Sequence, residues 1–170
     1  MGGAILVAGS AVAFVRTRGY AVSPEREAKL ESLSPWQLIV LEHAARRIAA
    51  PDRESRQIPS PDDVDVAGYV DAYIARMPPT VRRDLLRFFA YVEHLAPIAA
   101  GFGSRFTRLG PEDQDRVLSR IEASDETLLR GGFAGLKALV FMGYYRDPRT
   151  WKILGYDGPR VMRPLGGWSP

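Results

Sequence analysis

Prolines stand beside helix-capping residues at several places in this chain of 170 residues, and they indicate where its helices begin. Ser34-Pro35, Pro78-Pro79 and Gly110-Pro111 each precede a segment with apolar residues at three- and four-residue steps. Proline at the first helical position costs no hydrogen bond, because that N–H has no partner inside the helix. No segment alternates polar and apolar residues over a useful length, so the sequence predicts an all-α fold.

The apolar spacing predicts an orthogonal or irregular bundle of about five helices. The first runs from Ser34 to about Ala50, with Gln37 completing a capping box, and the second runs from Val64 to about Met77. A third helix begins at Thr80, and Pro97 and the Gly101-Phe102-Gly103 segment end it; a fourth begins at Pro111, and Ser124 or Asp125 caps a fifth. Their core-facing residues are Leu85, Phe88, Phe89, Val92 and Leu95 in the third, Val117, Leu118 and Ile121 in the fourth, and Leu129, Phe133, Leu136, Val140 and Gly143 in the fifth.

A dense group of aromatic, glycine and proline residues closes the folded part, and we call residues 147–159 the aromatic ledge. Asp147 is suited to cap a short helical turn, Pro148 to begin it, and Gly155 to end it in a left-handed conformation. The rings of such a turn either close the core or anchor a partner, and both roles stay open. The expected partner-binding residues are Tyr145, Trp151, Tyr156, Asp157 and Pro159, with Tyr144 in the core.

The sequence divides into residues 1–22, a helical domain over 23–162 and a C-terminal tail over 163–170. Gly2 to Val15 carries no charge, and its length matches the apolar core of a signal peptide better than a membrane span. Three interpretations compete: a signal whose basic start lies upstream of Met1, a short membrane anchor within residues 1–15, or a helix packed on a partner. Residues 16–33 are polar, and we expect an irregular tether there.

The composition excludes several kinds of chemistry. With no cysteine, the chain has no disulfide, thiolate nucleophile or iron–sulfur cluster.

His43 and His94 each follow a glutamate directly, so acid and imidazole point in different directions around a helix. We therefore expect hydrogen-bonding histidines, not metal ligands. The net charge of +3 is too small and too dispersed for nucleic-acid binding. No phosphate-binding loop or catalytic constellation appears, so we expect a noncatalytic protein without its own cofactor or metal.

Four segments in this order resemble the gluconate 2-dehydrogenase subunit 3 family. They are Leu33 to Gln37, Val66 to Tyr73, Arg105 to Leu109, and Gly143 through Pro159. The likeness covers roughly residues 33–159, and its motifs are diffuse and mark no catalytic residue.

The resemblance implies a small helical subunit that accompanies a large FAD-dependent dehydrogenase of the glucose–methanol–choline type, often with a cytochrome c subunit. The FAD would belong to that partner, and this chain would assist its folding, stability or export. Family members commonly begin with a twin-arginine signal, but no arginine pair precedes Gly2 to Val15. The resemblance favours the periplasm or cell envelope, and a cytoplasmic location stays open. The alternative is a free-standing, envelope-associated helical module with no dehydrogenase partner.

Overall fold

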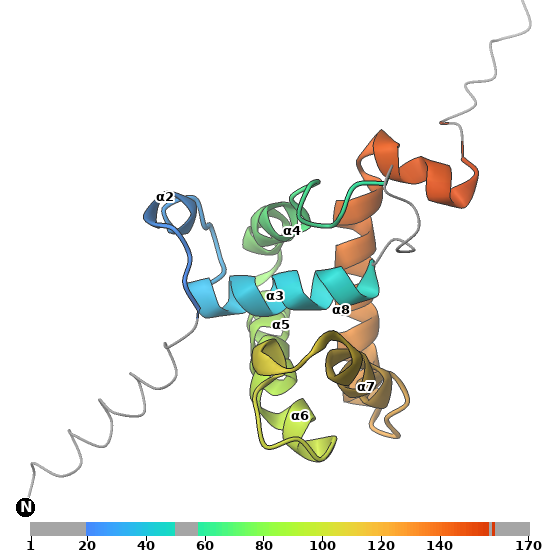
Figure 1. Ribbon diagram of the computed structural model, residues 1–170. Helices are drawn as coiled ribbons and strands as arrows, with labels where there is room; N and C mark the ends of the chain where they lie inside the picture. The colour runs from blue at the N-terminus through green and yellow to red at the C-terminus, as the bar shows by residue number, and fades with distance from the viewer. Residues whose placement is uncertain (1–19, 50–57, 157, 159–170) are drawn as a thin grey trace, which may run out of the picture.

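The computed structural model describes residues 20–49, 58–156 and 158 of the chain. These residues form helices and no strand, which confirms the predicted all-α fold (Figure 1). None of the helices in this described part is long and apolar enough to cross a membrane. The helices are α2 (Pro24–Glu27), α3 (Pro35–Ile48), α4 (Val66–Ala75), α5 (Pro79–Ala90), the π-helical turn η1 (Tyr91–Leu95), α6 (Ala96–Ala99), the 3-10 helix η2 (Phe106–Arg108), α7 (Pro111–Glu122), α8 (Thr127–Tyr145) and the 3-10 helix η3 (Pro148–Leu154).

Helix α3 crosses the middle of the bundle and contacts α4, α5, α7 and α8 (Figure 1). It begins where the sequence predicted, because the backbone N–H and the hydroxyl of Ser34 both donate to Oε1 of Gln37, at 2.9 and 2.8 Å. Burying one large aliphatic side chain stabilises a fold by about 1.5–3 kcal/mol. Helix α3 supplies three such side chains with no exposed surface, Leu38, Val40 and Leu41.

The third predicted helix differs from the sequence interpretation. After α5 the backbone widens into η1, where the N–H of Ala96 donates to the carbonyl of Tyr91, five residues earlier. This wide turn restarts the helix, so Pro97 lies in the first turn of α6, where proline is tolerated, and does not end the helix. The helix ends at Ala99, just before the predicted terminating segment Gly101-Phe102-Gly103. The turn also shifts the helical register. Leu95 is therefore 58% exposed, and its predicted place in the core is wrong, whereas Phe89 and Val92 are fully buried as expected.

Helices α7 and α8 carry the predicted apolar faces. Pro111 begins α7, and α8 buries Phe133, Leu136 and Val140. The predicted cap of α8 is wrong by one or two residues, because Glu126 takes that position. The hydroxyl of Ser124 instead accepts the backbone N–H of Glu126 at 3.2 Å, which turns the chain before the helix starts.

Residues 20–33 are packed on the body, so the expectation of an irregular tether is wrong from Tyr20 onward. Tyr20 is only 8% exposed and Leu33 is 4% exposed. Ser23 caps α2, and Pro24 begins it. Residues 1–19, which include Gly2 to Val15, and residues 50–57, 157 and 159–170 lie outside the described residues.

Candidate partner-binding surface

The aromatic ledge is built by the local signals that predicted it. A side-chain oxygen of Asp147 accepts the backbone N–H of Arg149 at 2.9 Å, Pro148 begins η3, and Gly155 ends it with φ of 60°. The guanidinium of Arg149 also donates to both carboxylate oxygens of Asp147, and these hydrogen bonds lower the pKa of Asp147 to about 2. The cap therefore stays ionised over the physiological pH range.

Two contacts fasten the ledge to the end of α8. Thr150 has no exposed surface, and its hydroxyl lies 3.3 Å from the carbonyl oxygen of Tyr144 in α8, as well as 2.8 Å from that of Asp147 within the ledge. The indole Nε1 of Trp151 donates to the carbonyl oxygen of Tyr145 at 2.7 Å. These contacts satisfy carbonyls near the end of α8 that have no partner inside the helix. The ledge is thus a fixed extension of α8, and it projects from the bundle (Figure 1).

The rings at the end of α8 and in the ledge are placed differently from one another. Tyr144 is 1% exposed and its hydroxyl donates to the carbonyl of Pro59 at 2.8 Å, which confirms its place in the core. Trp151 is half-buried, with its ring centroid 5.3 Å from that of Tyr156. Tyr156 is 46% exposed. A tilted ring pair with one member fixed by a hydrogen bond presents an ordered apolar surface.

The remaining expected site residues are Tyr145, which is half-buried, and Asp157 and Pro159, which lie outside the described residues. The ring of Tyr145 lies 5.2 Å from that of Tyr144 and 5.8 Å from that of Phe141. The structure therefore brings Tyr145, Trp151 and Tyr156 together at one end of α8. Leu154, which the sequence did not single out, adds a side chain that is 59% exposed to the same segment.

A buried carboxylate that sequence reasoning missed holds residues 31–33 against the body. Asp71 of α4 is 2% exposed. Its Oδ2 accepts the backbone N–H of Glu31 at 2.7 Å, and its Oδ1 accepts those of Ser32 and Leu33 at 3.0 and 2.6 Å. Three N–H donors compensate the loss of hydration of one buried carboxylate. We call this arrangement the Asp71 clamp.

A second missed carboxylate, Glu93 of η1, has no exposed surface. It accepts the hydroxyl of Tyr20 at 2.5 Å and the backbone N–H and hydroxyl of Thr107 at 3.1 and 2.7 Å. The guanidinium of Arg105 lies 4.2 Å from the ring centroid of Tyr20 and also faces Glu93. Burial, followed by the hydrogen bond to Glu93, raises the pKa of Tyr20 well above its usual range. This Glu93 cluster joins the first described residue to η1 and η2.

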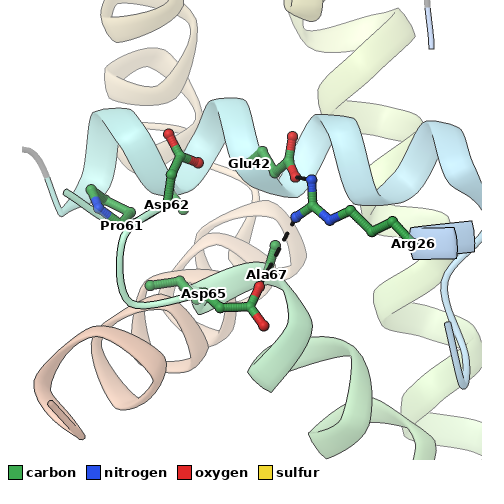
Figure 2. Close-up of a pocket in the computed structure, with 8 residues that line it drawn as sticks. Arg26, Glu42, Pro61, Asp62, Asp65 and Ala67 are labelled. Atoms are coloured by element: carbon green, nitrogen blue, oxygen red, sulfur yellow. Dashed lines mark ion pairs between the residues drawn. The ribbon is translucent and has the colours of Figure 1, made fainter. Parts of the chain in front are cut away.

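The acidic residues near the start of α4 are explained by ion pairs. The guanidinium of Arg26 lies 2.5 Å from Glu42 of α3 and 4.0 Å from Asp65, and dashed lines in Figure 2 mark these ion pairs. Arg46 pairs with Asp62 at 2.7 Å. The hollow between these groups measures about 10 Å³, roughly the space that one water molecule needs. Among the described residues, no three metal-ligating side chains gather into a metal-binding group.

The two histidines lie on helices as half-buried residues. Nδ1 of His43 lies 2.9 Å from the amide nitrogen of Gln114, which itself donates to the carbonyl of Phe106. Burial and, secondarily, the charge of Arg46 lower the pKa of His43. The expectation of a hydrogen-bonding His43 is confirmed.

The sequence matches the model of the family described as gluconate 2-dehydrogenase subunit 3 over residues 36–158. Searches of curated proteins and of solved structures found no significant match. The matched region runs from α3 through the described part of the aromatic ledge and covers well over half of the chain. It also includes Asp71, Glu93 and Trp151. The chain therefore belongs to the gluconate 2-dehydrogenase subunit 3 family.

Proposed function

We propose that this chain is a noncatalytic small subunit that binds and stabilises an FAD-dependent dehydrogenase of the glucose–methanol–choline type. The name of its family describes a subunit of a dehydrogenase, which supports association with a catalytic subunit. In this proposal FAD belongs to that catalytic subunit, in some complexes beside a cytochrome c subunit.

The observation that carries the proposal is the rigid exposure of the aromatic ledge. Trp151 is oriented by its hydrogen bond to the carbonyl of Tyr145, and Tyr156 lies beside it with nearly half of its surface exposed. Aromatic side chains held in place before binding lose little conformational entropy on contact, and they are enriched among residues that dominate interface energies. The ledge therefore has the chemistry of a protein interface.

The polar groups in the interior support a structural role for the chain. Asp71 and Glu93 are occupied by donors from residues 20–33 and from η2, and His43 is paired with Gln114. A general acid or base must reach a substrate proton, and these groups are engaged inside the fold instead. We expect the purified chain to show no flavin absorbance and no dehydrogenase activity with artificial electron acceptors.

Copurification tests the association directly. A tagged full-length chain expressed in its native host should recover a flavoprotein of the glucose–methanol–choline type in near-equal amount, with FAD absorbance in the purified complex. A gene for such a flavoprotein beside this one would supply the partner for the same test by coexpression. Recovery of this chain alone would overturn the proposal and favour a free-standing helical module.

The ledge is tested with Trp151→Ala and Tyr156→Ala in the full-length chain. Each should weaken binding of the purified flavoprotein by about 2 kcal/mol or more, as aromatic hot spots do. Tyr73→Ala is a matched control, because Tyr73 is 37% exposed on α4 and lies outside the ledge. Tyr156→Ala also separates binding from folding, since the exposed ring of Tyr156 contributes less to the core than Trp151. Unchanged affinity in both ledge variants would remove the ledge from the interface.

We also propose that the complex works in the periplasm or cell envelope and that residues 1–15 direct or anchor it there. The support is the uncharged segment Gly2 to Val15 together with the usual twin-arginine export of the family. A reporter that is active only after export, fused behind residues 1–22 in the native host, should become active. A reporter that remains inactive would contradict a signal function for this segment.

A further inference from the structure

The outward face of α8 is apolar along its whole length. Of the 19 residues of the helix, only Arg130 and Lys137 are charged. The opposite side packs on the core through Phe133, Leu136 and Val140. A surface helix normally presents polar side chains to solvent, and a helix that is apolar all round is normally buried. The exposed residues on the outward face are Gly131, Ala134, Gly135, Ala138 and Met142.

The glycines on this face have no role in packing within the described part of the chain. A Cβ built on Gly131 or Gly135 would have no atom within 4 Å. In contrast, a Cβ on Gly132 would lie 2.7 Å from the ring of Phe88, and one on Gly143 would lie 3.1 Å from Val66. Glycine is among the poorest helix formers, so two glycines that no described residue packs against weaken α8 without a compensating contact in that part of the chain. Because glycine has no Cβ, it permits the close approach of another molecule to the helix backbone.

Larger apolar side chains mark both ends of the face. Leu128 is 84% exposed near the start of α8, and Met142 is 41% exposed near its end. Tyr145 follows at helical spacing and connects to the aromatic ledge through the hydrogen bond from Trp151. The outward face of α8 and the ledge are therefore continuous at Tyr145.

The charges at the edges of this face are positive. Arg130 donates to the carbonyl of Ser124 at 2.6 Å, and Arg146 to the carbonyl of Val64 at 2.7 Å. No carboxylate in residues 20–49 or 58–156 forms a salt bridge with either guanidinium, whereas Lys137 pairs with Glu122 at 2.7 Å. Helix α8 itself has no acidic residue. A partner with acidic side chains along the edges of an apolar stripe would be complementary.

We propose that the outward face of α8 receives one helix of the flavoprotein subunit, which lies along Gly131, Gly135 and Ala138 and faces Arg130 and Arg146 with acidic side chains. This inference rests on the proposed function and extends the interface from the ledge along α8. Residues 159–170 of the chain itself fit this face less well, because they carry Arg160 and Arg163 and no acid.

The test uses Gly135→Leu in the full-length chain and the purified flavoprotein. Because nothing lies near Gly135 and leucine favours helices, the melting temperature of the isolated variant should equal or exceed that of the parent. The larger side chain should separate the two helices and weaken the complex at least tenfold. Arg83→Leu is the matched control: it adds an exposed leucine on α5 and should leave affinity within twofold.

Arg130→Gln tests the charge. It should weaken binding several-fold at low ionic strength, and the difference from the parent should shrink as salt is raised. Unchanged affinity in both Gly135→Leu and Arg130→Gln would overturn the inference. If Tyr156→Ala loses binding in the same assay while those two variants keep it, the proposed function stands and this face is not part of the interface.

Two other occupants would also overturn the inference. In the first case, isolated Gly135→Leu would melt at a lower temperature than the parent, and this difference would disappear when residues 159–170 are removed from both proteins. That result would place the tail of this chain on α8. A parent chain that is dimeric by light scattering, with Gly135→Leu monomeric, would place a second copy there. If the parent binds no flavoprotein, the proposed function and this inference fail together.

Discussion

Replacing Asp71 should cost far more stability than replacing any exposed acid of this chain. The carboxylate is 2% exposed and accepts three backbone N–H groups, from Glu31, Ser32 and Leu33, at 2.6–3.0 Å. Hydrogen bonds to a charged group contribute about 1.5–3 kcal/mol each, and they are not additive within one cluster. Asp71→Ala leaves all three donors without their acceptor, and water can reach the exposed Glu31 most easily. We therefore expect a loss of about 3–5 kcal/mol.

Asp71→Asn separates charge from shape. Its amide oxygen can still accept from Ser32 and Leu33, while its NH₂ group would face the N–H of Glu31. The expected loss is about 2 kcal/mol, one charged hydrogen bond with some weakening of the others. Urea unfolding followed by circular dichroism measures both values. Hydrogen exchange should also accelerate at residues 31–33 before it does in α3.

The matched control is Asp84→Ala, which removes a carboxylate that is 63% exposed and pairs with two exposed arginines of α5. Exposed pairs of this kind contribute about 0–1 kcal/mol. The reasoning fails if Asp71→Ala costs less than about 1 kcal/mol, or no more than Asp84→Ala, because the clamp would then have no net effect on stability.

Three further predictions concern the interior. Tyr20→Phe removes the hydroxyl that donates to Glu93 and should lower the free energy of unfolding by about 1.5–3 kcal/mol in urea; an unchanged midpoint would refute the anchoring role of Tyr20. Burial lowers the pKa of His43 from 6.5, so the unfolded state binds the proton more tightly than the folded state. The contribution of His43 to the free energy of unfolding should therefore be constant above about pH 6.5 and fall as the pH drops toward the lower pKa of the folded state. His43→Gln should reduce the slope of unfolding free energy against pH in that range. Equal slopes in the variant and the parent would contradict the assignment of this pH dependence to His43. Gly132→Ala should destabilise the fold by about 1–3 kcal/mol, since its Cβ would meet the ring of Phe88 at 2.7 Å; a rise in melting temperature would show that Phe88 moves freely.

The helix starts and the geometry of the ledge were predictable because their causes are local. A capping side chain, a proline and a terminal glycine act within about four residues, as at Ser34, Pro111 and Gly155. The widened turn η1 has no such local signal. Its consequence, the exposure of Leu95, could not be read from a regular helical period.

The buried carboxylates were missed because their partners are distant in sequence. Asp71 bonds to residues 38–40 positions earlier, and Glu93 bonds to Tyr20, 73 positions away. A signal was nevertheless present. Asp71 and Glu93 each occur at core-facing spacing, four residues after Ala67 and Phe89, where an acid must find donors. The role of Tyr145, Trp151 and Tyr156 in binding remains a prediction.

The Glu93 cluster and the Asp71 clamp also determine how the fold would respond to tension on its N-terminus. A pulling force applied there would load the hydrogen bond of Tyr20 first, then the ion pair of Arg26, and then the hydrogen bonds of residues 31–33. The N-terminal partner in each of these contacts precedes α3 in the sequence. The contacts of residues 20–33 would therefore break one after another before the force acted on the central helix. Mechanical resistance of this domain would therefore be set by the buried carboxylates of Glu93, Glu42 and Asp71 and by the rates at which they release their donors, and the helical bundle would contribute only after all three had opened.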